Sequence, residues 1–204
     1  MSHATVRIIL DEHAALSAML RSILLLLAEH RRAGTLPDFA VLRAMLFYVD
    51  EFPEKRHHLK ETEILFPKLR ARTPEARHVL DRLDRDHARG ERAIRDLEHA
   101  LLAFEMMGET RREAFETTAR TYVAFYLEHM QDEEREILPL AERLLDERDW
   151  AELDEAFGAN RDPLTGHEPE AEYRALFSRI VNAIPAPIGF GDPGQLQVPI
   201  PNLR

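Results

Sequence analysis

The chain has 204 residues, of which 45% are hydrophobic and 31% charged, and its formal net charge is −10 at pH 7. It contains no cysteine, which excludes disulfides, iron–sulfur clusters, thiolate zinc sites and cysteine nucleophiles. Its acidic balance, without a basic stripe interleaved with aromatics, argues against nucleic acid as a partner. No apolar run approaches the roughly 18 residues of a membrane span, and the first residues lack a signal-peptide pattern, so we expect a cytoplasmic protein with no membrane contact.

The first two predicted helices cover residues 4–32 and 38–71. The first ends at Gly34, and its apolar residues recur three and four apart, as on a buried helical face. This buried stripe consists of Leu10, His13, Leu16, Leu20, Ile23 and Leu27. In the second helix, Pro53 predicts a bend, and Pro67 predicts either another bend or the beginning of the helix end.

The third helix is predicted to begin after Thr73 and Pro74 and to end at Gly108. Its regular apolar stripe contains His87 and Gly90. A glycine inside a helix costs about 1 kcal/mol relative to alanine. Gly90 therefore indicates the close approach of another element or of a ligand.

The fourth helix is predicted to start at Thr110 as its cap, and short connections join all four helices. Such a pattern predicts an all-α, up-down-up-down four-helix bundle, which we assign to residues 4–146. Residues 147–204 form a C-terminal extension with short helices near 150–157 and 170–183 and a Pro/Gly-rich tail. Because the tail is apolar, we expect it to be ordered and to pack on its own bundle or on a partner subunit.

Two sequence motifs repeat in the same order. Each copy has one histidine, then a second histidine on the next helix, followed by glutamate four residues on and proline ten residues on. The copies consist of His13, His57, Glu61 and Pro67, and of His87, His129, Glu133 and Pro139. Both copies therefore place ionisable side chains on otherwise apolar helical faces.

Burying six ionisable groups inside a bundle is costly unless a cation compensates. Imidazole and carboxylate donors without sulfur suit iron, manganese or zinc, and two glutamates among four histidines suit a pair of bridged ions. We expect iron, with zinc or manganese as substitutes. The predicted metal ligands are His13, His57, Glu61, His87, His129 and Glu133.

Over residues 5–145 the chain resembles the hemerythrin-like, or HHE cation-binding, family. The segments that carry the resemblance are Asp11-Glu12-His13, His57-His58-Leu59-Lys60-Glu61 with Leu65-Phe66-Pro67, Asp86-His87, and His129 through Glu134. The resemblance implies a bundle around a non-haem diiron centre with an oxo or hydroxo bridge, in which Glu61 and Glu133 bridge. It also implies a protein that binds, senses or reacts with O2, NO or peroxide, or that handles iron.

The sequence departs from the oxygen-carrying members at two positions. Those members have a second histidine four residues after the third-helix ligand, where this chain has Glu91, which becomes a candidate third carboxylate. They also place the last carboxylate five residues after histidine, so Glu133 and Glu134 both stay open. Four histidines resemble the iron-centre repair and iron-sensing members, although the cysteine-bearing N-terminal segment of the repair proteins is absent.

Several neighbours of the motifs are further candidates. His58 lies about 100° round the helix from His57 and is expected to face outward or to lie behind the ligands. Tyr122 and Tyr126, within two turns of His129, could hydrogen-bond a bound ligand or pack in the core.

Two alternative functions stay open. A ferritin-type iron oxidase or store is disfavoured because such sites have Glu-x-x-His spacing, whereas here histidine precedes glutamate by four residues. An interaction module with a purely structural metal is the other alternative. We do not expect a dedicated metabolic enzyme, and the sequence is compatible with a homodimer.

Overall fold

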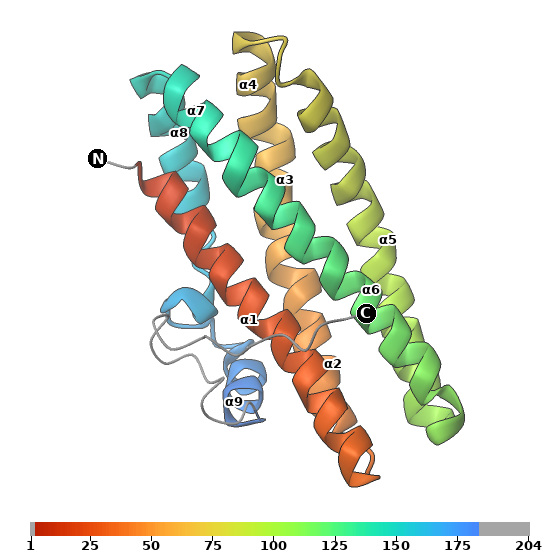
Figure 1. Cartoon of the computed structure of the whole chain (residues 1–204). Coiled ribbons are helices and arrows are strands. Elements are labelled where there is room, and N and C mark those ends of the chain that lie inside the picture. The colour runs from red at the N-terminus through yellow and green to blue at the C-terminus, as the bar shows by residue number, and fades with distance from the viewer. Residues whose placement is uncertain (1–2, 184–204) are drawn as a thin grey trace.

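The computed structural model describes residues 3–183, and every regular element within that range is a helix. Four helical rods run alternately up and down in chain order and pack side by side (Figure 1). The all-α, antiparallel four-helix bundle predicted from the sequence is therefore confirmed. Within the described residues, no helix is both long and apolar enough to cross a membrane.

The rods differ in their regularity. The first is α1 (Ala4–Ala33) and the third is α5 (Arg77–Met107), both uninterrupted α-helices. The second rod is an unbroken run of α2 (Phe39–Val49), η1 (Asp50–His57), α3 (His58–Lys60), η2 (Glu61–Leu65) and α4 (Phe66–Arg72). The fourth rod consists of α6 (Glu109–Asp132), η3 (Glu133–Ile137) and α7 (Leu138–Leu144).

Short connections with specific caps reverse the chain between rods. Gly34 ends α1 with a left-handed backbone (φ 66°), which favours glycine. Asp38 caps α2 by accepting backbone N–H groups. The expected cap at Thr110 is wrong, because α6 begins directly after Gly108 (φ 63°), and the Thr110 hydroxyl donates to the carbonyl of Met107 instead (3.0 Å).

The elements η1, η2 and η3 are π-helical, with backbone bonds that reach five residues back. These bonds run from the N–H of His58 to Pro53, of Phe66 to Glu61, and of Leu138 to Glu133. A proline lies in η1 or just after η2 and η3, and its ring crowds the carbonyl four residues back. The wider turn accommodates that ring, so the second rod continues past Pro67 to Arg72.

Two apolar cores fill the bundle, one on either side of a band of buried polar side chains. Along α1, Val6 and Ile9 belong to one core, His13 lies in the band, and Leu16 begins the other core. The other three rods cross the band in the same way. The predicted stripe of α1 was wrong at one position, because Ile9 is fully buried whereas Leu10 is 41% exposed.

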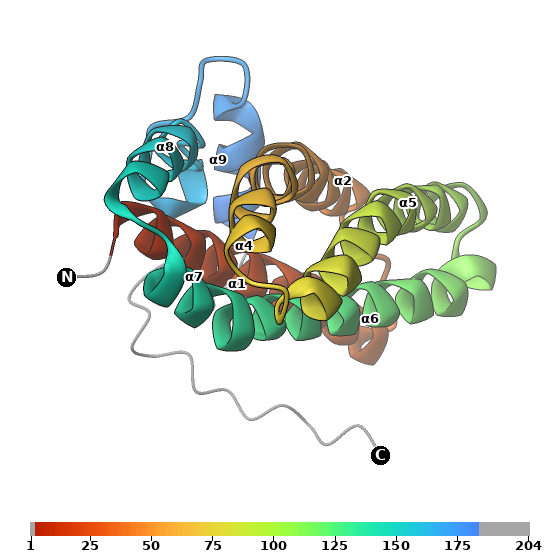
Figure 2. The ribbon, with the colours of Figure 1, turned by 90° about the horizontal axis from the view of Figure 1, so that it is seen from above.

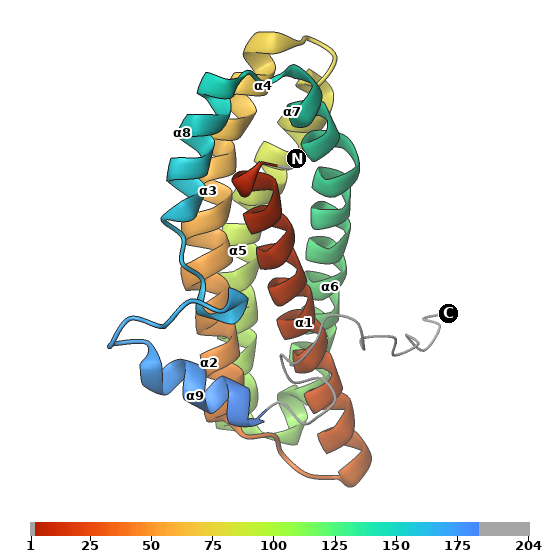
Figure 3. The same cartoon turned by 90° about the vertical axis from the view of Figure 1, so that its left-hand side faces the viewer.

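The C-terminal extension packs against the outside of the bundle. It contains α8 (Glu147–Gly158), η4 (Pro163–Thr165) and α9 (Arg174–Ala183); α8 contacts α1, and α9 contacts α2 (Figures 2 and 3). α8 confirms the short helix expected near 150–157, whereas α9 begins at Arg174 rather than at residue 170. The predicted packing of the tail, residues 184–204, lies outside the described residues.

The start of α1 and the extension hold each other. Asp154 of α8 accepts hydrogen bonds from the backbone N–H (2.7 Å) and hydroxyl (2.6 Å) of Thr5, although α1 has no capping side chain of its own. The ring of His3 stacks on Trp150 with centroids 4.1 Å apart. Phe177 of α9 belongs to the core that begins at Leu16, where its ring packs edge-on against Phe52 with centroids 5.5 Å apart.

We predict that Gly90→Ala destabilises the protein. An added Cβ would lie 1.8 Å from the Oη and 2.9 Å from the Cζ of Tyr126, whose ring is buried. Overpacking typically costs about 1–3 kcal/mol, against a gain of about 1 kcal/mol in helix propensity. Gly158→Ala, where nothing lies within 4 Å, is the matched control and should leave the melting temperature unchanged or higher. Equal melting temperatures for both variants would contradict the tight contact at Gly90.

Candidate metal centre

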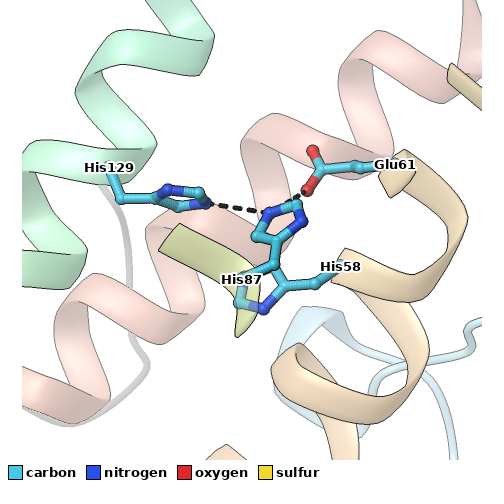
Figure 4. Close-up of side chains that lie close together, drawn as sticks. All are labelled: His58, Glu61, His87 and His129. Atoms are coloured by element: carbon cyan, nitrogen blue, oxygen red, sulfur yellow. Dashed lines mark hydrogen bonds and ion pairs between the residues drawn. The ribbon is translucent and has the colours of Figure 1, made fainter. Parts of the chain in front are cut away.

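Seven buried side chains of the described chain meet in the polar band. They are His13, His57, His58, Glu61, His87, His129 and Glu133. Potential ligand atoms lie within 4.8 Å of one another in two groups that share Glu61; the groups are His58, Glu61, His87 and His129 (Figure 4), and His13, His57 and Glu61. These two groups contain five of the six predicted ligands and add His58. The sixth, Glu133, is in neither group, but its carboxylate oxygens lie 3.2 Å from Nε2 of His129 and 3.4 Å from Nε2 of His13.

Each buried glutamate faces histidines of both motif copies, with a different oxygen toward each. The distances from histidine Nε2 to carboxylate oxygen are 3.2 Å for His57–Glu61, 3.4 Å for His87–Glu61, 3.2 Å for His129–Glu133 and 3.4 Å for His13–Glu133. A carboxylate that bridges two ions requires this arrangement, with one oxygen toward each half of the site.

Several of these atoms are buried without a hydrogen bond. They are Nε2 of His13 and of His57, Oε2 of Glu61, and both carboxylate oxygens of Glu133. A buried polar atom left unpaired costs about 1–3 kcal/mol. Lone pairs of imidazole and carboxylate that converge without hydrogen bonds fit a cation, so the residues present suit the metal that the sequence predicted.

Four of the five histidines of the centre direct Nδ1 to a hydrogen-bond partner outside it, whereas Nδ1 of His129 makes no hydrogen bond among the described residues and has Asp86 nearby. The partners are Glu134 for His13 (3.0 Å), Glu12 for His57 (2.6 Å), Glu54 for His58 (3.3 Å), Thr62 for His87 (2.8 Å) and, at ion-pair distance, Asp86 for His129 (4.0 Å). Metal-ligating histidines almost always use their second nitrogen in this way, which fixes the ring and raises ligand basicity. Nε2 is therefore the nitrogen that faces into the centre, where those of His87 and His129 lie 3.1 Å apart.

Without an ion, the histidines and glutamates of the centre compensate one another. Burial alone would lower the pKa of His129, but Glu133, Asp86 and Glu61 together outweigh it and raise that pKa to about 10. Burial and the charge of Glu133 favour a higher pKa for Glu61, but the charge and contacts of His57, together with His87, outweigh both and bring it to about 2. Imidazolium protons thus occupy the place of a cation.

His58 does not face outward, as one reading of the sequence expected. It is buried, and its ring stacks on those of His87 (centroids 4.5 Å apart) and Tyr126 (5.5 Å). The expectation assumed 3.6 residues per turn, whereas the π-helical η1 immediately before His58 has wider turns. Burial, followed by the charges of His87 and His129, lowers the pKa of His58 well below its usual value, so this ring is neutral.

Sequence reasoning missed Glu54, which holds His58 from the side away from the centre. The hydroxyls of Tyr122 (3.0 Å) and Tyr126 donate to its Oε1. These tyrosines therefore anchor a buried carboxylate and close the core around it. The four-residue spacing between Glu54 and His58 was the available signal, and it was obscured by the charged stretch around Pro53.

The other carboxylate candidates lie outside the convergence. Glu133 is 1% exposed, whereas Glu134 is 41% exposed and contacts the outer nitrogen of His13. Glu91 is exposed on α5, where its nearest charged partner is Arg95 (3.9 Å). The geometry therefore favours Glu133 over both for a position facing an ion.

A small cavity lies beside one half of the centre. Its volume is about 10 Å³, room for about one water molecule. The lining includes His13, His57 and His58 together with Asn160 and Asp162 of the C-terminal extension. A molecule of very few atoms is all that this space admits.

The Hemerythrin HHE cation binding domain matches the chain over residues 4–141. No curated protein and no solved structure matches the chain. The matched range includes the seven side chains of the centre and ends before α8 begins. The chain therefore belongs to the hemerythrin HHE cation-binding family.

Proposed function

We propose that this chain is a non-haem diiron protein that binds or reacts with a small ligand such as O2, NO or peroxide. The observation that carries the proposal is the set of buried, unpaired imidazole and carboxylate atoms between two apolar cores. Two oxygen-bridged iron ions would supply changes of oxidation state and a position for the ligand. The protein supplies the side chains that would hold these ions and the residues that limit the size of the ligand.

The side chains divide into two unequal halves. His13 and His57 face one position, while His58, His87 and His129 face the other. Glu61 and Glu133 offer one oxygen to each half, by the distances given above. The three-histidine half would therefore offer an ion five protein donors and the two-histidine half four. A small ligand would thus find fewer protein donors at the His13–His57 half, beside which the small cavity lies.

The surrounding residues restrict what can reach that position. Apolar side chains cover the centre on both sides, and the cavity has room for about one water molecule. A buried position of this size favours small ligands over bulky ones. This size limit supports a diatomic ligand or peroxide better than an organic substrate.

Anaerobic reconstitution with Fe2+ followed by exposure to air tests the proposal. We expect two irons per chain and an absorption band in or near the visible that changes when azide or NO is added. Turnover of many irons per chain would support storage instead. One iron or none per chain, or a spectrum insensitive to every small ligand, would contradict the proposal.

Substitutions at the centre should rank by the atoms they remove. We predict that Glu61→Ala and Glu133→Ala lose bound iron most severely, because each removes donors from both halves. His58→Ala should also weaken binding by removing one nitrogen, and His99→Ala, an exposed histidine, is the control. Metal analysis after dialysis measures the ranking. If His58→Ala retained iron as well as His99→Ala, His58 would not be a ligand.

Metal binding should release protons, because histidines that carry a proton in the apo protein must lose it to bind. His129, with a pKa of about 10, is protonated at pH 7.5, whereas Glu61, with a pKa of about 2, is already ionised. Affinity should therefore rise with pH up to about 10. Calorimetric titration with Zn2+ at pH 7.5, in two buffers of different ionisation enthalpy, measures the protons released. Identical heats in both buffers would contradict the proton-filled centre.

A further inference from the structure

One metal-facing histidine is connected to the C-terminal extension by side-chain hydrogen bonds. The amide of Asn160 donates from Nδ2 to Glu12 Oε2 (2.9 Å), the same oxygen that lies 2.6 Å from Nδ1 of His57. The Oδ1 of Asn160 accepts from the ammonium of Lys60. Asn160 is 2% exposed and lies beyond residue 141, where the family match ends.

The extension holds Asn160 firmly in this place. Phe157, at the end of α8, sets its ring edge-on to His57 with centroids 5.7 Å apart. The hydroxyl of Tyr48 donates to Asp162 (2.6 Å), and Asp162 in turn caps η4 by accepting the N–H of Leu164 (2.8 Å). The backbone on both sides of Asn160 is thus anchored to the bundle.

The orientation of the amide decides what it does to Glu12. Because Lys60 has no acceptor, the group it meets on Asn160 is the carbonyl oxygen, and the NH2 group is the one that points at Glu12. Glu12 Oε2 therefore has a second contact beside Nδ1 of His57, and the two contacts together fix the position of this oxygen. Held there, Glu12 orients the ring of His57 so that Nε2 faces into the centre.

We propose that Asn160 is a positioning residue of the metal centre: it holds Glu12 so that His57 presents Nε2 to an ion. The inference rests on the proposed metal-binding function and assigns part of it to a segment outside the matched domain. Asn160 also lines the cavity, so filling space is the rival explanation. Loss of an orienting partner typically weakens metal affinity about 10- to 100-fold. Because Asn160 acts through Glu12, we expect about tenfold.

The test compares release of Zn2+ to a chromophoric chelator from full-length protein. Asn160→Leu keeps the bulk and removes both hydrogen bonds, Asn160→Ala removes bulk and bonds, and Asn182→Leu on the exposed face of α9 is the matched control. We expect both Asn160 variants to release Zn2+ about ten times faster than the wild-type protein. The control variant should release Zn2+ at the wild-type rate. The visible spectrum of fully loaded Co2+ protein should change in Asn160→Leu, because a ligand has been reoriented.

Several outcomes would overturn the inference. Release from Asn160→Leu at the wild-type rate, with fast release from Asn160→Ala alone, would make Asn160 a space-filling residue. An unchanged Co2+ spectrum with full occupancy would also count against positioning. If Asn160→Leu does not fold, Lys60→Met takes its place, and wild-type release from that variant overturns the proposal. Wild-type protein that holds two Zn2+ but shows no ligand-sensitive iron spectrum would contradict the proposed function alone, whereas uptake of no metal contradicts both.

Discussion

The bundle depends on one constraint: two carboxylates and five imidazoles are buried in the polar band, to which all four rods contribute. Desolvating so many ionisable groups is costly, and hydrogen bonds among them leave several atoms unpaired. The raised pKa of His129 and the depressed pKa of Glu61 show how the protein offsets this cost with protons. A pair of cations would offset this cost better. The burial that destabilises the fold would therefore also favour metal binding.

The widened turns connect this constraint to the backbone. Both η2 and η3 begin at the buried glutamate of their motif, and each is followed by a proline two residues after its end. The two motif copies therefore share a backbone distortion as well as a set of side chains. Glu61 and Glu133 lie at equivalent positions in these turns, which explains why both can face histidines of either copy. The repeat seen in the sequence is therefore also a repeat of backbone structure, present in the second rod and again in the fourth.

Sequence periodicity was sufficient to predict the four rods and to place six side chains of the centre on their buried faces. Apolar spacing and the repeated motif are local signals, which a sequence shows directly. Periodicity failed where the helix departs from 3.6 residues per turn, as at His58. Asn160 and Glu12 are separated by 148 positions and meet only through the docking of α8, so no spacing rule connects them. Glu54 was missed for a related reason, since its tyrosine partners lie on another rod.

The stacking of His3 on Trp150 has a practical consequence. The chain has a single tryptophan, and that residue lies in α8 against the beginning of α1. Its fluorescence therefore originates from one contact, the junction between the N-terminal residues and the extension. Emission can report detachment of α8 separately from melting of the bundle, which circular dichroism follows. The molecule thus contains an intrinsic optical probe for the segment that carries Asn160.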